Sequence, residues 1–527
     1  MRLSSAPSRH LPFAVLLLLA GALLRVAGLF HPPSLDIDEA RYLVTAHHVA
    51  AQVGYSDWRG PQTHIHPAHP LLTAALAGSG IEGLEAAGRL ATCVGATLCL
   101  IPLALLADRL GGRLAALLAL ALLAFHPVLA RNASTIAPEG MYVLFTGGAL
   151  LTLLPRADIP LPRWRWALAG GLFGAAYLAR PEGLPVGILA GGVAAACFPG
   201  PARRRVEGWI VFLLVMLAPA SPFLIFIHRV TGSWSLTGKT LELFFIGQGL
   251  RETGGAPPDA MRLRELEAQW RGVLPYLAAH PRETAQAALL NGRGVFGRIL
   301  PSQVGLAGLP GLLAWLAAAW RDAALRRRTL LLLAPCLTLL LMLLTFPNQR
   351  VVSSVLPFLL ILSAIGWARL AQVTTLSSRA TLALLLAILV LGAALGWGRT
   401  LGRLHGVMDF AAEAPERVAA RKALTRQPDP ARIVSNDPVL SFYIGDPSLF
   451  GPPGHYAPLS GRTCSDLTGE LGGRQASVAI LTGSATLPAD ALASNSPRCP
   501  LREIFRTTRS QARPLQVLTL EPTGAPR

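Results

Sequence analysis

Long apolar runs recur along most of the chain and constrain its fold more than any motif, because about 20 such residues can cross a bilayer. Backbone polar groups in lipid must be satisfied within their own segment, so these runs are expected to be helices. About eleven spans are predicted, at 11–30, 86–107, 114–130, 137–154, 166–180, 184–198, 207–229, 299–320, 329–346, 351–370 and 380–398. With 52% hydrophobic and 14% charged residues, the chain is predicted to be an all-α polytopic membrane protein.

The arginines of the short loops predict the orientation, because positive charge accumulates in cytoplasmic loops. With a cytoplasmic N-terminus, the cytoplasmic loops hold Arg2, Arg9, Arg109, Arg113, Arg156, Arg163, Arg165, Arg203, Arg204, Arg205, Arg321, Arg326, Arg327, Arg328, Arg369 and Arg379. The short outer loops hold only Arg41, Arg59, Arg131, Arg180 and Arg350. The first run is too long for the apolar region of a signal peptide, so a retained helix is expected. An odd number of spans then places the C-terminus on the outer side. The composition is typical of bacteria, and the predicted location is the bacterial inner membrane.

The net charge of +18 does not indicate a nucleic-acid partner, because the arginines are scattered between apolar runs and form no basic stripe. Membrane topology accounts for them better.

Three larger segments are expected on the outer side of the membrane. Residues 1–398 are predicted to form the membrane domain, with a first outer loop at 31–85 and a second at 230–298. Residues 399–527 are predicted to form a small extracytoplasmic α/β region, with β-like runs at ARIVSN, LSFYIG and SVAILTG. Cys464 and Cys499 lie in this region and are predicted to form a disulfide, whereas the other four cysteines lie inside spans.

Charged residues gather at the predicted outer face, where arginines run against the general bias. Asp36, Asp38 and Glu39 follow the first span, and the remaining members are Arg41, Arg131, Glu139, Arg180, Glu182 and Arg350, with Arg25 and Arg89 inside apolar runs nearby. Guanidinium groups bind phosphate oxygens well, and a nearby carboxylate can act as a general base. The alternative for each arginine is structural: it reaches toward lipid headgroups or pairs with a neighbouring glutamate.

The first outer loop also contains His64, His66 and His69 in QTHIHPAHPLL. No cysteine or suitably spaced carboxylate completes a tetrahedral zinc site, so no metal site is predicted there. Asp36 and Asp38 could together hold a divalent ion beside a phosphate, but a metal-free base is favoured, and no cofactor is expected. Lys239 in TGSWSLTGKT is a further candidate phosphate ligand, against a solvated loop lysine as the alternative.

Seven stretches in order resemble the GT-C superfamily of membrane glycosyltransferases, in the branch of the protein O-mannosyltransferases and lipid A aminoarabinose transferases. These stretches are LLLLAGALLRVAGLF, DIDEARY, HPAHPLL, AAGRLATCVGATLCLIPLALLADRLGG, RNASTIAPEGMYVLF, GLFGAAYLARPEGL and QRVVSSVLPFLLILSAIGWARL. Two departures from the family pattern are Pro67-Ala68-His69-Pro70 in place of the usual Pro-Pro, and Glu139 in place of a commoner aspartate. These departures bear on the acceptor side and on the role of His66.

The resemblance implies a helical membrane fold around a cavity open to the outer side, and a sugar donor linked to a polyprenyl or dolichyl phosphate. It implies that Asp38 is the catalytic aspartate, Glu39 the adjacent acid, and Arg41 and Arg350 cations on the phosphate side. The expected partners are membrane lipids, the lipid-linked donor, and a lipid, glycan or protein acceptor.

Two other classes of function remain as alternatives. A transporter or flippase would be favoured by inverted repeats and midplane charges, and neither is evident in this sequence. A non-catalytic envelope assembly subunit would show no transfer from any lipid-linked donor.

Overall fold

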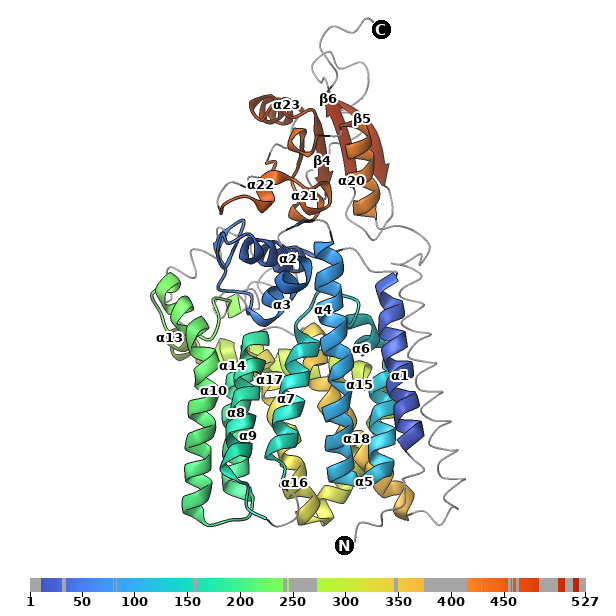
Figure 1. The fold of residues 1–527 in the computed structure, drawn as a ribbon, viewed down its shortest axis with the longest axis vertical. Helices are drawn as coiled ribbons and strands as arrows, with labels where there is room; N and C mark the ends of the chain where they lie inside the picture. The colour runs from blue at the N-terminus through green and yellow to red at the C-terminus, as the bar shows by residue number, and fades with distance from the viewer. Residues whose placement is uncertain are drawn as a thin grey trace, which may run out of the picture. The chain divides into compact units, whose positions relative to one another are not determined.

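The computed structural model is mostly helical and divides into two compact units (Figure 1). The first unit comprises Met1–Phe30, Thr63–His69 and Leu90–Arg399, and the second comprises His31–Gln62, Pro70–Arg89 and Thr400–Arg527. Residues described by the structure are 11–30, 35–78, 80–81, 83–155, 159–239, 244–245, 273–345, 349–373, 415–427, 429–453, 456, 458–460, 464–482, 501–507 and 515–520.

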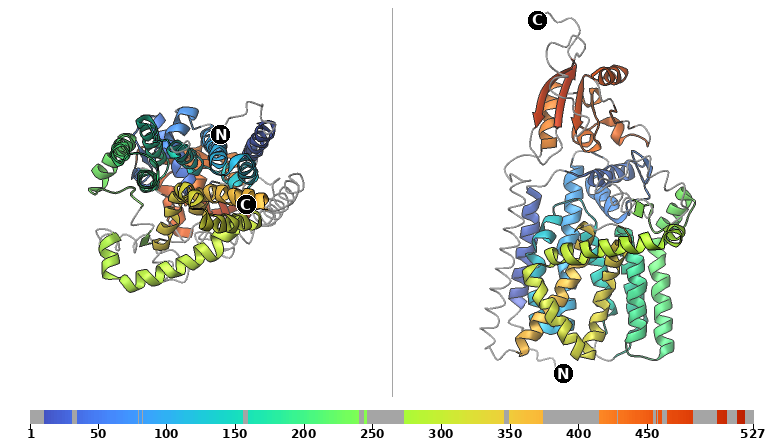
Figure 2. Two further views of the ribbon diagram at one scale, coloured as in Figure 1. Left: turned by 90° about the horizontal axis from the view of Figure 1, so that it is seen from below. Right: turned by 180° about the vertical axis from the view of Figure 1, so that it is seen from behind.

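The first unit is a bundle of apolar helices. Its helices are α1 (Leu11–Ala27), α5 (Leu100–Ala124), α6 (Pro127–Asn132), α7 (Glu139–Leu153), α8 (Arg163–Ala179), α9 (Gly183–Cys197), α10 (Ala202–Thr231), α13 (Val273–Ala279), α14 (Pro281–Gly294), α15 (Leu300–Arg321), α16 (Ala323–Leu333), α17 (Leu337–Leu344) and α18 (Gln349–Val373). Short helical turns lie at Gly28–Phe30, Val295–Ile299 and Ala334–Cys336. Two helices, α3 (Ala68–Ala77) and α4 (Leu84–Leu98), begin in one unit and end in the other. Figure 2 shows α14 running across the other helices of the bundle.

Small residues let the helices of the bundle approach closely, as is typical inside membranes. The central helix is α18, which packs on α5 and α15. Of the residues in its most apolar stretch, 94% are buried. A Cβ atom on Gly366 of α18 would collide with the Gly311 carbonyl oxygen of α15. Similarly, α1 touches α5 through Gly21, where an added Cβ would lie 2.8 Å from the Ala124 Cβ. Most other side chains of α1 are exposed, as expected for a helix that faces lipid.

Apart from the last one, the predicted spans coincide with helices of the structure. Six helical segments of the described residues are long and apolar enough to cross a membrane. One of them, Leu84–Ala124, contains a turn at Gly112, whose φ of 81° favours glycine, and this turn lies in the predicted loop between two spans. The predicted span 380–398 lies outside the described residues, so the count of eleven stays a prediction.

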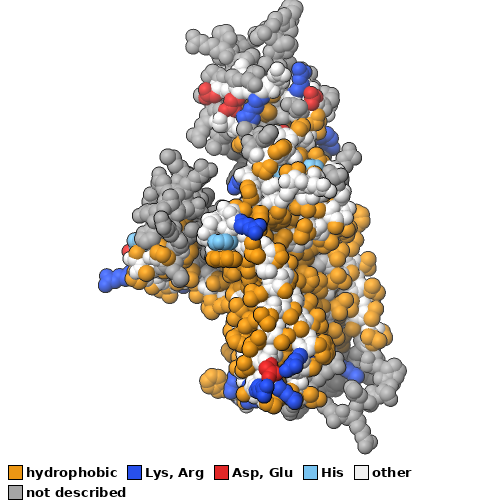
Figure 3. Space-filling model, turned by 60° about the vertical axis from the view of Figure 1, so that its left-hand side comes forward, with side chains coloured by type: hydrophobic (Ala, Val, Ile, Leu, Met, Phe, Trp, Pro, Cys, Tyr) orange, Lys and Arg blue, Asp and Glu red, His pale blue; other side chains and the backbone are white. Residues whose placement is uncertain are grey.

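Arginines at the predicted cytoplasmic helix ends cap backbone carbonyl groups. Arg109 donates to the Leu151 carbonyl, Arg165 to that of Leu154, and Arg205 to those of Ala195 and Ala196, at 2.6–2.9 Å. A cation at a helix C-terminus satisfies unpaired carbonyls and complements the helix dipole. Figure 3 shows basic side chains gathered at this end of a hydrophobic surface.

The second unit begins with a block that we call the loop block, residues 35–62. It contains α2 (Ile37–Ala50) and a short hairpin of β1 (Ser56–Asp57) and β2 (Gly60–Pro61). Arg41 Nε of α2 donates to Asp57 Oδ2 of the hairpin at 2.8 Å, and both side chains are buried. His48 Nδ1 donates to the Ser56 carbonyl oxygen at 3.0 Å. These two contacts fasten the hairpin to the helix.

The C-terminal part of the second unit is an α/β structure, as predicted. Its sheet has the order β3-β4-β6-β5, built from β3 (Ile433–Ser435), β4 (Val478–Thr482), β5 (Leu501–Thr507) and β6 (Leu515–Leu520). The β3–β4 pair is parallel and the other two pairs are antiparallel. The accompanying helices are α20 (Pro415–Arg426), α21 (Pro438–Ile444), α22 (Pro447–Phe450) and α23 (Cys464–Gly473).

One predicted strand of this region is wrong. The run LSFYIG forms α21, because Asp437 caps the helix start through a bond from Val439 N at 2.7 Å and Pro438 occupies the first turn. Gly445 ends the helix with a φ of 72°. These local start and stop signals outweigh the β preference of an aromatic run. The Cys464 side chain and Cys499 lie outside the described part of the chain, so their disulfide stays a prediction.

Candidate active site

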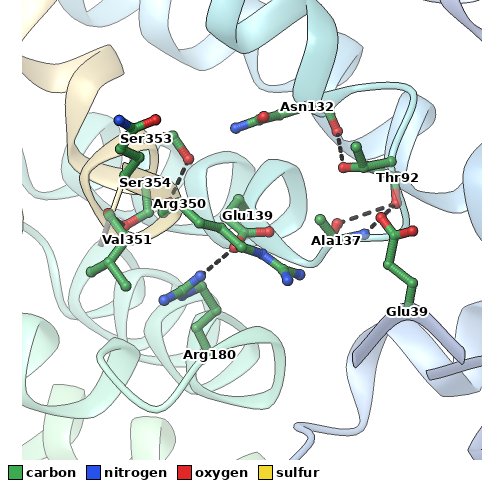
Figure 4. Close-up of polar contacts among 12 residues, drawn as sticks. Glu39, Thr92, Asn132, Ala137, Glu139, Arg180, Arg350, Val351, Ser353 and Ser354 are labelled. Carbon is green, nitrogen blue, oxygen red and sulfur yellow. Dashed lines mark hydrogen bonds and ion pairs between the residues drawn. The ribbon is translucent and has the colours of Figure 1, made fainter. Parts of the chain in front are cut away.

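The first unit contains a largely buried group of opposite charges that we call the charged cluster: Glu139, Arg180, Glu182 and Arg350. Glu139 Oε1 accepts hydrogen bonds from Arg180 Nη1 at 2.6 Å and from Arg350 Nε at 2.8 Å (Figure 4). Arg180 also binds Glu182 through two bonds, of 2.9 and 3.2 Å. The α8–α9 turn and the start of α18 therefore each direct a guanidinium group to the Glu139 carboxylate at the start of α7.

Local sequence explains why Arg180 and Glu182 lie at a turn. Arg180 has extended backbone angles, φ −150° and ψ 144°, because the following Pro181 disfavours helical geometry at this position. Helix α9 begins three residues after Arg180, at Gly183, where a Cβ atom would collide with the backbone of Tyr177. A glycine is therefore required for the α8–α9 turn to close tightly enough to present both charges.

Two buried amides bind the backbone at the end of α17 and at the start of α18, where Arg350 is the second residue. Asn291 of α14 donates to the carbonyl oxygens of Leu343 and Thr345, at 2.9 and 2.8 Å. Gln303 of α15 donates to the Gln349 carbonyl oxygen at 2.8 Å. Neither amide was predicted from the sequence. Gln303 lies in the mainly apolar helix α15, and this position was a signal that could have revealed it. Asn291 lies in the polar helix α14 and carried no such signal.

The cluster contains as many carboxylates as guanidinium groups, so its interior is electrically balanced. Burial disfavours the charged form of Glu182, but the Arg180 guanidinium outweighs it, and the pKa of Glu182 is lowered. The side chains of Glu139 and Arg180 are 7% and 12% exposed, whereas that of Arg350 is 31% exposed. Arg350 is therefore the cation of the cluster that an anion from outside can reach most easily.

His66 lies next to the cluster and is buried. Its Nδ1 donates to the Tyr177 carbonyl oxygen at 2.7 Å, and its ring contacts those of Tyr177 and Phe223 edge to face. Burial lowers the pKa of His66 to about 3, despite the opposing charge of Glu182. This histidine is therefore neutral at physiological pH.

His69 and Lys239 also belong to the first unit, and each is connected to residues near the charged cluster. His69 Nε2 lies 2.9 Å from Thr92 Oγ1, which accepts the amide of Ala137, two residues before Glu139, at 3.0 Å. Gly238 N donates to the Thr63 carbonyl oxygen at 2.9 Å, which brings the segment before Lys239 against the first outer loop. The Lys239 charge acts on His66, so this lysine lies near the cluster.

Arg131 and Arg25 are not members of the cluster. Arg131, in the last turn of α6, is exposed and belongs to no ion pair among the described residues. Arg25 is 1% exposed and donates to the carbonyl oxygens of Gly21, Leu123 and Ala124 at 2.9–3.1 Å. Arg25 thus caps the end of α5. Its side chain and that of Glu139 both line a small cavity of about 40 Å³.

The second unit holds the other candidate residues, Asp36, Asp38 and Glu39, which we call the acidic helix start. Asp36 is the N-cap of α2: its Oδ1 accepts from Glu39 N at 2.7 Å, while Glu39 Oε2 accepts from Asp36 N at 3.2 Å. This reciprocal pair is a capping box. Asp38 is the second residue of the helix and is half-buried. Asp36 and Glu39 thus shape the helix start that carries Asp38.

Arg41, predicted as a phosphate ligand, is buried and bonded to Asp57 and Gln62. In the structure Arg41 joins α2 to the hairpin, and its role as a phosphate ligand stays a prediction. The sequence analysis missed Asp57 because its partner lies 16 positions away. Arg89 likewise pairs with Glu85 at 2.7 Å on the same helix.

The histidines of the first outer loop do not share a metal-binding arrangement in the structure. His66 and His69 bond to different partners, a backbone carbonyl and a threonine hydroxyl. Within the described parts of both units, no group of three or more His, Cys, Asp or Glu side chains is arranged to hold a metal ion.

The chain is similar to one protein family in sequence and to solved structures in fold. Residues 68–226 match the family model described as "Dolichyl-phosphate-mannose-protein mannosyltransferase". No curated protein matches the chain. Among solved structures, ArnT from Cupriavidus metallidurans bound to undecaprenyl phosphate aligns with a TM-score of 0.58 at 16% identity, covering 98% of this chain and 99% of that one.

Two further solved structures support the same fold. The apo state of the same ArnT gives a TM-score of 0.57 at 15% identity, covering 97% of this chain and 98% of that chain. The apo oligosaccharyltransferase of Archaeoglobus fulgidus gives 0.56 at 13% identity, covering 90% of this chain and 69% of that chain. The predicted resemblance is thus confirmed, and the chain is a multi-pass membrane protein with the GT-C fold.

Proposed function

We propose that the chain is a glycosyltransferase that moves a sugar from a polyprenyl-phosphate donor to an acceptor hydroxyl on the outer face of the bacterial inner membrane. The observation that carries this proposal is the charged cluster, in which Glu139 holds Arg180 and Arg350 together at the end of an apolar bundle. Guanidinium groups held in place before the substrate arrives suit a phosphate better than flexible ones do. The lipid named with the ArnT structure, undecaprenyl phosphate, is an anion of this kind.

The proposed reaction is a single displacement with inversion at the anomeric carbon. Asp38 accepts the proton of the acceptor hydroxyl as its oxygen bonds to the anomeric carbon. On the opposite face the bond from that carbon to the phosphate oxygen breaks, and the lipid phosphate leaves with an additional negative charge. Arg350 and Arg180, with Lys239 as a further ligand, stabilise that charge. No metal takes part in this scheme.

The other candidate residues support these groups. Glu139 and Glu182 hold the arginines, and Asp36 and Glu39 hold the helix start that carries Asp38. His66 and His69 line the acceptor side in this proposal. The acceptor is a lipid, a glycan or a protein, and the sugar is a hexose or a pentose.

The test is mass spectrometry of envelope lipids, glycans and proteins from a strain that lacks the chain and is complemented with wild type, Asp38→Asn or Asp466→Asn. Asp466 lies in α23, is exposed, and serves as the matched control. We expect Asp38→Asn to lose the sugar-modified product by roughly a hundredfold or more, because a general base is removed. Equal product from Asp38→Asn and wild type, at equal protein levels in the membrane, removes Asp38 from this role.

A further inference from the structure

The acidic helix start belongs to the loop block, whose helix and hairpin are joined by side-chain contacts. Two buried contacts already join α2 to the hairpin, from Arg41 to Asp57 and from His48 to Ser56. The Arg41 contact lies three residues beyond Asp38, and the His48 contact lies near the end of α2. Any element that holds this block therefore also sets the position of Asp38.

The C-terminal part of the second unit contacts the loop block at three separate points. At its beginning, Leu35 N donates to Tyr443 Oη of α21 at 3.1 Å. At the end of α2, the His47 ring meets the Phe450 ring of α22 nearly perpendicularly, with centroids 5.3 Å apart. At the hairpin, the Trp58 and Tyr456 rings are 6.1 Å apart and also edge to face.

The first of these contacts lies directly beside the acidic carboxylates. Leu35 is buried, and it precedes Asp36, the N-cap whose side chain sets the first turn of α2. A buried backbone N–H requires an acceptor, and here the Tyr443 hydroxyl supplies one. Loss of that hydroxyl would free the residue before the cap, and with it the first turn that carries Asp38.

We propose that the C-terminal α/β region positions the acidic helix start, and that Tyr443 is its positioning residue. The region is then a part of the catalytic apparatus that sets the direction of the Asp38 carboxylate. This inference rests on the proposed function for its catalytic consequence. Its structural content, that Tyr443 orders the first turn of α2, can be tested without any transfer assay.

The structural test is hydrogen–deuterium exchange on the full chain in nanodiscs, comparing wild type with Tyr443→Phe and Thr425→Val. The Phe variant keeps the ring and loses only the hydroxyl that accepts from Leu35. Thr425 is an exposed control whose hydroxyl bonds to the Arg421 carbonyl within α20. We expect a peptide covering 35–50 to exchange roughly fivefold faster in Tyr443→Phe and unchanged in Thr425→Val.

Two exchange results overturn the inference. One is a wild-type rate for the 35–50 peptide in Tyr443→Phe. The other is an equal acceleration in the β4 peptide, which would show that the variant loosens the whole C-terminal region.

The catalytic test uses the envelope product together with binding of undecaprenyl phosphate. Tyr443→Phe should lower the product about fivefold, in proportion to the ordering that it loses, and leave undecaprenyl phosphate affinity unchanged. Faster exchange without any loss of product overturns a positioning role. If Asp38→Asn retains its product, the proposed function fails, and the exchange experiment still decides whether Tyr443 orders α2.

Discussion

A single carboxylate, Glu139, organises the charged cluster. It accepts from two guanidinium groups that reach it from the α8–α9 turn and from the start of α18. A buried charge without partners is costly, so each member of the cluster depends on the others. Of its two cations, Arg350 has the larger exposed fraction, and a phosphate is therefore expected to meet it first.

Arg350→Ala should weaken binding of undecaprenyl phosphate by about tenfold or more, because it removes a charge-assisted hydrogen bond to the ligand. Arg229→Ala is the matched control, since Arg229 is an exposed arginine in the last turn of α10. The measurement is binding to the purified chain in nanodiscs. Equal weakening by both variants would mean that general positive charge, and not the cluster, attracts the lipid.

His66 should make stability depend on pH. Its pKa is 6.5 in the unfolded chain and about 3 when buried, so the unfolded chain binds more protons between these values. Stability is therefore full above pH 6.5 and decreases as pH falls toward about 3. His66→Asn keeps a side-chain donor for the Tyr177 carbonyl and cannot titrate.

The measurement for His66 is the melting temperature of the full chain between pH 6.5 and about pH 4.5, below the ordinary histidine pKa. We expect wild type to lose more stability than His66→Asn over this window. Parallel curves for the two proteins would contradict burial of the neutral imidazole.

At the scale of helices and turns, glycine contacts decide how closely the bundle can pack. Gly183→Ala should destabilise the chain by about 1–3 kcal/mol and weaken donor binding, because the new methyl group collides with the Tyr177 backbone beside Arg180. Gly192→Ala in the same helix is the control, since an added Cβ there meets nothing within 4 Å. Thermal unfolding of both variants is the measurement. A Gly183→Ala variant as stable as Gly192→Ala would contradict the tight α8–α9 turn.

Hydropathy predicted the helices well, because lipid leaves helical structure as the main option for an apolar run. It could not predict α21, where Asp437, Pro438 and Gly445 impose a helix on a β-like sequence. Alternating arginines also predicted which turns share an end of the bundle. They could not show that Glu139 joins Arg180 to Arg350, because pairings across 41 and 211 positions depend on packing.

For the whole molecule, the structure groups residues 31–62 of the first outer loop with the C-terminal region. From the sequence, that region was predicted only as a small extracytoplasmic α/β region, with no contact to the first outer loop. Its contacts with the loop block arise from Leu35, His47 and Trp58, whose partners lie some 400 positions further along the chain. No local pattern announces such contacts, so a sequence alone could not reveal them.

The most direct test of the central claim is whether the chain cleaves a lipid-linked sugar. Purified wild type in nanodiscs, supplied with an envelope lipid extract, should convert glycosylated polyprenyl phosphate into free polyprenyl phosphate, with an equal amount of sugar appearing on an acceptor. Asp38→Asn should do neither. Movement of the intact lipid-linked sugar between leaflets, without any release of polyprenyl phosphate, would contradict the account and indicate a transporter.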